Sequence, residues 1–222
     1  MSLHLQRDLV QIKKEILQLG NMVEVAINNA ILSLIDRRPE LAESVIKNEK
    51  FINQKEVLIE ENCLKILALH QPVAVDLRFI VVILKVNNDL ERMGDFAVNA
   101  AKRAISLSKQ APIPYPPEFT NTMSKGIITM VHDSLDALVK LDVNIARKVI
   151  AMDDDIDEVN RLMYVELQSL MEKDSSTINR AVELLSTSRY LERIADLATN
   201  IAEEIIFIVE GEIVRHHLGT NY

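Results

Sequence analysis

The chain has 222 residues and a formal net charge of −8, and residues 111–222 carry 10 basic and 19 acidic side chains. This acidic balance argues against nucleic acid as a main partner, because a phosphate backbone demands a basic protein face. A single cysteine excludes an internal disulfide and favours a reducing compartment, and the longest apolar run, Phe79–Leu84, is too short to cross a membrane.

The first half of the chain has apolar residues at helical spacing in three long stretches. We expect one helix from about Leu5 to Asp36 and a second from Pro39, which suits a first helical position, to His70. Asp76 is expected to cap a third helix that ends near Lys109. No basic segment followed by a long apolar stretch precedes them, so neither a signal peptide nor a membrane anchor is expected.

A proline-rich segment, residues 111–117, then forbids continued helix and predicts an extended linker. Three more helices follow, from about Glu118 to Leu141, from Val143 to Met171 and from Ser176 to Glu210. No alternating strand pattern is present. We therefore predict an all-α protein of two similar antiparallel three-helix bundles, with domains at residues 1–110 and 118–222.

A twelve-residue pattern occurs twice, at residues 90–101 and 191–202, which indicates a duplicated unit. In each copy two carboxylates and an amide follow one another at every fourth residue, so they share one stripe of a helix. Like charges at this spacing repel, and a cation between them would relieve the repulsion. The candidate ligands are Glu91, Asp95 and Asn99 in the first copy and Glu192, Asp196 and Asn200 in the second.

A helical wheel places these stripes beside the core and predicts that they face outward from the bundle. Carboxylate and amide oxygens suit hard cations such as Mg, Ca, Mn or Fe. In the second copy Glu203 extends the stripe where the first has Lys102, so the second site is expected to bind cations more strongly. The alternative is that these are ordinary solvated helix residues. The acidic run Asp153–Glu158 lacks the glycine and final glutamate of a calcium loop and is interpreted as a solvated helix face.

The repeated pattern closely resembles that of the phosphate-uptake regulators of the PhoU family, whose mark is a duplicated Glu/Asp-x-x-x-Asp motif. Further segments resemble family signatures in the expected order, at residues 22–24, 71–78, 132–136, 174–178 and 214–216. The chain departs from the family pattern at Ala195, where glycine is common, and at Asn28, where an acidic pair with Glu24 would need aspartate.

The resemblance implies metal sites at the two motifs, as multinuclear clusters of divalent or trivalent Fe, Mn, Zn or Mg. It makes Glu91, Asp95, Glu192 and Asp196 the ligands, and it adds the acidic positions Glu24, Asp133 and Asp136.

The resemblance also implies a cytoplasmic, non-enzymatic adaptor that holds back phosphate acquisition. Its partners would be the ATPase subunit of the phosphate-specific ABC transporter and a sensor histidine kinase, and we expect a homodimer or higher oligomer. Two alternatives stay open: a carboxylate-bridged metalloenzyme of the phosphoesterase type, which would need a pocket with a general base, and a structural oligomerisation module.

Overall fold

The computed structural model describes residues 3–211, so the family-like segment at residues 214–216 lies outside the described residues. Within that range there are seven α-helices, a π-helix, a short 3-10 helix and no strand. Their bounds are α1 Leu3–Ile35, α2 Pro39–His70, α3 Ala74–Ser108, η1 Phe119–Ser124, α4 Lys125–Lys140, α5 Val143–Ala151, α6 Asp153–Lys173, η2 Ser175–Thr177 and α7 Ile178–Glu210.

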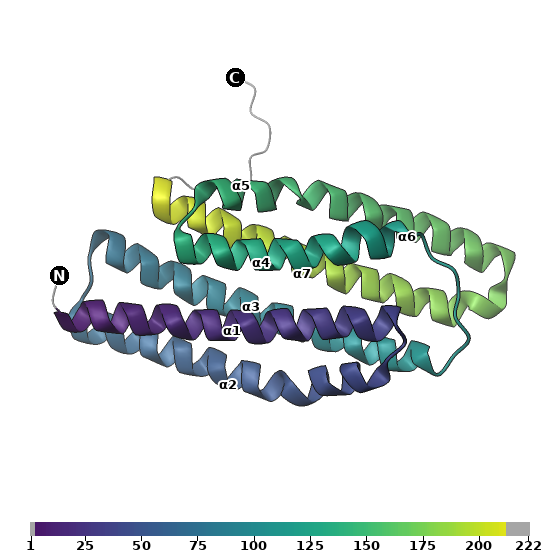
Figure 1. Ribbon diagram of the computed structural model, residues 1–222, viewed down its shortest axis with the longest axis horizontal. Coiled ribbons are helices and arrows are strands. Elements are labelled where there is room, and N and C mark those ends of the chain that lie inside the picture. Colours follow the sequence, from purple (N-terminus) through teal and green to yellow (C-terminus); the bar gives the residue numbers. More distant parts are fainter. Residues whose placement is uncertain (1–2, 212–222) are drawn as a thin grey trace, which may run out of the picture.

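The helices form two three-helix bundles that lie side by side along one long axis (Figure 1). The first bundle consists of α1, α2 and α3, and the second of α4, α7 and the consecutive helices α5 and α6. Contacts of α3 with α7 and of α1 with α4 join the two. The prediction of two similar all-α bundles is confirmed. No helix among residues 3–211 is both long and apolar enough to cross a membrane.

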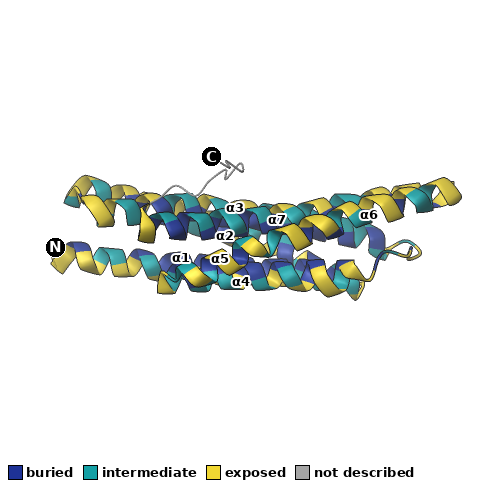
Figure 2. Ribbon diagram, turned by 90° about the horizontal axis from the view of Figure 1, so that it is seen from above, coloured by how far each residue is buried: buried dark blue, intermediate teal, exposed yellow. Residues whose placement is uncertain are grey.

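The core is aliphatic and runs continuously through both bundles. Buried residues gather where the helices face one another, and exposed residues cover the outside (Figure 2). The central helices α3 and α7 bury the small residues Ala97, Ala101, Ala198 and Ala202 with almost no exposure. Small side chains let helix backbones approach closely, so these alanines allow α3 and α7 each to pack against several neighbours.

Three expected helix boundaries differ in the structure. Asp76 does not cap α3, because the helix begins earlier, after Val73, and Asp76 lies in its first turn, where a carboxylate still favours the helix dipole. The fourth helix begins with one π-helical segment, Phe119–Ser124. The fifth breaks at Met152, and α6 then begins with three aspartates, which its N-terminal dipole stabilises.

The two bundles meet mainly where α3 and α7 pack antiparallel. An ion pair lies at each end of this contact. The ammonium of Lys85 donates to both carboxylate oxygens of Glu204, at 3.1 and 3.0 Å, and Glu204 is only 2% exposed. At the other end the Arg103 guanidinium lies 3.2 Å from the Glu183 carboxylate. These two ion pairs therefore link the repeats at either end of their contact.

Candidate metal centre

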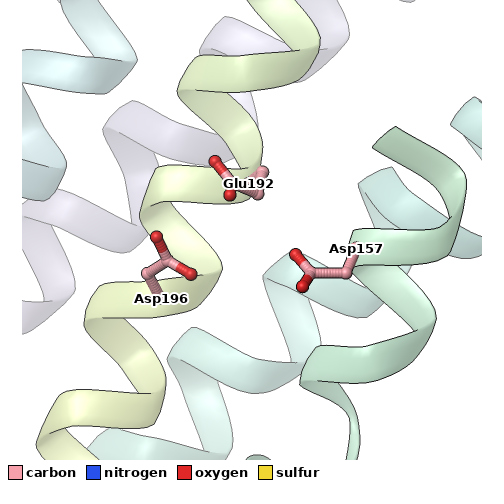
Figure 3. A group of neighbouring side chains, drawn as sticks. All are labelled: Asp157, Glu192 and Asp196. Atoms are coloured by element: carbon pink, nitrogen blue, oxygen red, sulfur yellow. The ribbon is translucent and has the colours of Figure 1, made fainter. Parts of the chain in front are cut away.

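Three carboxylates of the second repeat come together between α6 and α7. Glu192 and Asp196 lie one turn apart on α7, and Asp157 faces them from α6 (Figure 3). One oxygen of each lies within 4.8 Å of one oxygen of the other two. A single ion between the two helices would therefore reach all three side chains.

The electrostatics of this group favour a bound cation. Burial, and then the negative charge of Asp196, raises the pKa of Glu192. Burial also raises the pKa of Asp196, while Arg193 lowers it and Asp157 raises it. The exposed Arg193 guanidinium lies 3.8 Å from Glu192 and 3.6 Å from Asp196, which is too long for a hydrogen bond. The carboxylates thus repel one another, and the nearby positive charge of Arg193 is not hydrogen-bonded to either Glu192 or Asp196.

Asp153 extends the group by one turn of α6. It is half-buried, and burial first, then the charges of Asp196 and Asp157, raises its pKa to about 6. Among residues 3–211 the Thr199 hydroxyl makes no hydrogen bond of good geometry, but it lies close enough to Asp153 to lower its pKa. The prediction that the run Asp153–Glu158 is a solvated helix face is therefore wrong for Asp153, whereas Asp154, Asp155, Asp157 and Glu158 are exposed. Asp157 is exposed and still lies close to Glu192 and Asp196.

This raised pKa predicts a pH dependence of stability in the chelator-treated protein. Asp153 has a pKa of about 6 when folded and an ordinary value of 3.8 when unfolded, so the folded state binds the proton more tightly. The contribution of Asp153 to the free energy of unfolding is most favourable below pH 3.8, falls as the pH rises to about 6, and is constant above that. Asp153→Asn is expected to flatten the fall in the free energy of unfolding across this window, measured by urea denaturation at a series of pH values. An unchanged slope in the variant would contradict the assignment.

The first repeat places its stripe against α2. Burial, and then the charges of Asp95 and of Glu56, raises the pKa of Glu91, and Glu49 adds a further negative charge. Glu49 and Glu56 lie on α2. The stripes thus face a neighbouring helix, at half-buried positions, and do not face outward as the helical wheel predicted. A wheel gives the angle from the core stripe but not which helix lies beside it.

The other predicted ligands lie in different surroundings. Asn99 and Asn200 are half-buried on α3 and α7, in the stripes of the carboxylates. Three acidic side chains on α1 and α4 each contact a basic group: Glu24 at 3.0 Å from His132, Asp133 at 2.9 Å from Lys148 and Asp136 at 2.7 Å from Lys140. The structure does not gather these three with Asp157, Glu192 and Asp196.

Sequence reasoning missed Asp157 and Asp153 as members of the site. The signal that could have found them is their own spacing, since two aspartates four residues apart on a helix repeat the pattern of Glu192 and Asp196. All the gathered donors are carboxylate oxygens. This donor set fits Mg, Mn, Ca or ferric and ferrous iron. It lacks the thiolates that Cu(I) prefers and the Cys and His ligands of a structural zinc site, although carboxylates also bind zinc.

Comparison with known proteins gives consistent matches along almost the whole chain. The family model described as PhoU domain matches twice, at residues 16–104 and 120–205. The "Phosphate-specific transport system accessory protein PhoU homolog" of Aquifex aeolicus is 41% identical over 210 residues, which are 95% of this chain and 95% of that protein. The crystal structure of PhoU from Pseudomonas aeruginosa is similar with a TM-score of 0.91 at 36% identity, over 93% of this chain and 99% of that one. The phosphate transport system regulatory protein PhoU of Streptococcus pneumoniae matches with a TM-score of 0.86 at 30% identity, over 95% and 99%.

Proposed function

The chain belongs to the PhoU family, and from that premise we propose that it is a metal-binding regulatory adaptor that negatively regulates phosphate uptake and phosphate-starvation signalling. The observation that carries the proposal is the 41% identity, over 95% of both chains, to a protein named as an accessory of the phosphate-specific transport system. The adaptor acts in the cytoplasm and without catalysis. It couples the ATPase subunit of the phosphate-specific ABC transporter to a sensor histidine kinase.

The metal would act by fixing the geometry of the helices. In the second repeat Asp157 approaches from α6 and Glu192 with Asp196 from α7, so an ion held by them ties two helices of one bundle together. Neutralising three carboxylates also removes a repulsion that separates those helices. A bound ion would supply positive charge, and the carboxylate oxygens of Asp157, Glu192 and Asp196 would coordinate it.

Partner docking would then depend on the shape and charge of the helix surfaces. The net charge of −8 suits contact with basic patches, because complementary charge speeds encounter and suppresses wrong partners. A groove between α1 and α2, lined by apolar side chains such as Met22, Val25 and Phe51, is also of the kind that partner helices occupy.

The regulatory part of the proposal is tested in a bacterium whose own PhoU-family gene has been deleted and that carries a phosphate-starvation reporter. The chain is expected to restore repression of the reporter when phosphate is plentiful, relative to an empty vector. A reporter that stays fully on, with the chain present at normal abundance, would refute the regulatory role.

The metal part is tested separately by mass spectrometry of tag-free protein. We expect Fe, Mn, Zn or Mg in the native chain, and its loss in a variant with Glu91, Asp95, Glu192 and Asp196 changed to alanine that remains helical by circular dichroism. If the native chain stays metal-free after incubation with these ions, the carboxylates are a contact surface and the adaptor works without metal.

A further inference from the structure

The two repeats share the Glu-x-x-x-Asp stripe but do not carry all of their other polar side chains at the same positions. Residues of α2 correspond to residues 104 higher in α5 and α6, as in Ala42 with Ala146, and residues of α3 to residues 101 higher in α7. Among the positions that differ in chemistry between the repeats, Asn53 corresponds to Asp157, Glu56 to Asn160 and Asn87 to Ser188.

The acidic residue on the helix opposite the stripe is therefore about one turn further along in the first repeat than in the second. In the second repeat Asp157 supplies the carboxylate that faces Glu192. In the first repeat that position is the exposed, neutral Asn53, and the carboxylate comes from Glu56 instead. A shift of three residues along a helix is a translation of about 4.5 Å. The negative charge opposite Glu91 is displaced by that amount relative to the second repeat.

The hydrogen bonds made by Glu56 and by its counterpart Asn160 also differ between the repeats. In the second repeat the buried Ser188 hydroxyl donates to Asn160 Oδ1 at 2.7 Å, which makes a neutral, satisfied pair. In the first repeat Asn87 Nδ2 donates to the Glu56 backbone oxygen at 3.0 Å and to its carboxylate at 3.3 Å. The first repeat thus has a carboxylate where the second has an amide.

The carbonyl oxygen of Asn87 marks this position as a ligand site. Asn87 is only 1% exposed, and its Oδ1 is buried without a hydrogen-bond partner among residues 3–211. This oxygen belongs to the amide whose nitrogen contacts Glu56, and Asn87 lies one turn before Glu91 on the same face of α3. A buried oxygen with no donor is costly. A cation would satisfy the oxygen and both acids at once.

We propose that the first repeat binds a hard divalent cation one helical turn away from the position used in the second repeat, with Glu56, Asn87 Oδ1 and Glu91 as its ligands. The inference rests on the proposed metal-binding function and specifies it. Two carboxylates and an amide carry less charge than the three carboxylates of the second repeat. The two repeats therefore bind the same ion with different affinity, and the second fills first.

The experiment isolates the first site in the full chain. The variant Asp157→Asn, Glu192→Gln, Asp196→Asn serves as background, because it removes the second-repeat carboxylates. Mn²⁺ is the probe, and its binding is followed by the loss of the free-ion signal in electron paramagnetic resonance. We expect native protein to bind Mn²⁺ in both repeats and the background variant to keep the weaker site.

The test variant in this background is Glu56→Asn with Asn87→Ser, which installs the residues that hydrogen-bond in the second repeat and so keeps the helices packed. The matched control is Asn53→Ala, at the position that corresponds to Asp157. We expect the dissociation constant for Mn²⁺ to rise at least tenfold in the Asn-Ser variant and to stay within twofold in the control, with both variants equally helical by circular dichroism.

The opposite pattern, with Asn53→Ala weakening binding and the Asn-Ser variant unchanged, would place the ion at the same position in both repeats and overturn the inference. A native chain that binds Mn²⁺ while the background variant binds none would also overturn it, yet leave metal binding by the second repeat intact. If native protein binds no Mn²⁺ at all, the metal-binding part of the proposed function fails together with this inference.

Discussion

Replacing Lys85 with methionine is expected to lower the free energy of unfolding by about 2–4 kcal/mol, because it removes a charged partner from a buried carboxylate. Glu204 is 2% exposed, and both of its oxygens accept from the Lys85 ammonium. The side chain of Lys85 is 41% exposed, which places the expected loss below that of a fully buried pair. The lysine also lies 5.7 Å from the centre of the Phe207 ring, and methionine keeps part of that packing.

The double variant with Glu204→Met as well separates charge from packing. It is expected to recover most of the loss, since exchanging both members of a buried ion pair for apolar groups is often neutral. The control is Lys140→Met, because the Lys140 and Asp136 side chains are 58% and 32% exposed and such a pair contributes less than about 1 kcal/mol. Urea denaturation followed by circular dichroism measures all three. If Lys85→Met and Lys140→Met lower the free energy of unfolding equally, the Lys85–Glu204 ion pair does not stabilise the contact between α3 and α7.

Neutralising the second-repeat carboxylates is expected to change stability in opposite directions with and without metal. In chelator-treated protein at pH 7, the variant Asp157→Asn, Glu192→Gln, Asp196→Asn should be more stable than native by about 1 kcal/mol, because it removes repulsion between three acids. At a Mn²⁺ concentration of 100 times the dissociation constant of this site, native protein should gain about 2.7 kcal/mol from it and the variant nothing. The order of the two unfolding midpoints therefore reverses when Mn²⁺ is added.

The matched control removes the same charge from the same helix. Asp154, Asp155 and Glu158 are exposed on α6, and changing them to Asn, Asn and Gln alters the net charge equally. This control should keep the full Mn²⁺ gain and show no increase in metal-free stability of the kind expected for the site variant. A control that loses the Mn²⁺ gain as the site variant does would mean that overall negative charge, and not the grouped ligands, attracts the ion.

Much of the fold follows from the sequence alone. Apolar residues at helical spacing and the proline-rich segment at residues 111–117 led to two similar three-helix bundles, which the structure confirms. These signals are local, since the period of a helix and the stiffness of proline act within a few residues. The repeated Glu-x-x-x-Asp stripe was visible for the same reason.

The composition of the candidate site required the tertiary structure. Asp157 lies 35 residues before Glu192 in the sequence, and nothing local indicates that α6 brings it within 4.8 Å of α7. The displaced position of the first repeat depends likewise on the register of α2 against α3, which brings Asn87 to Glu56. Register, facing and burial are set by packing between distant segments. The sequence therefore determined which residue types form the stripes, and only the packing of the helices decided which carboxylates share a site.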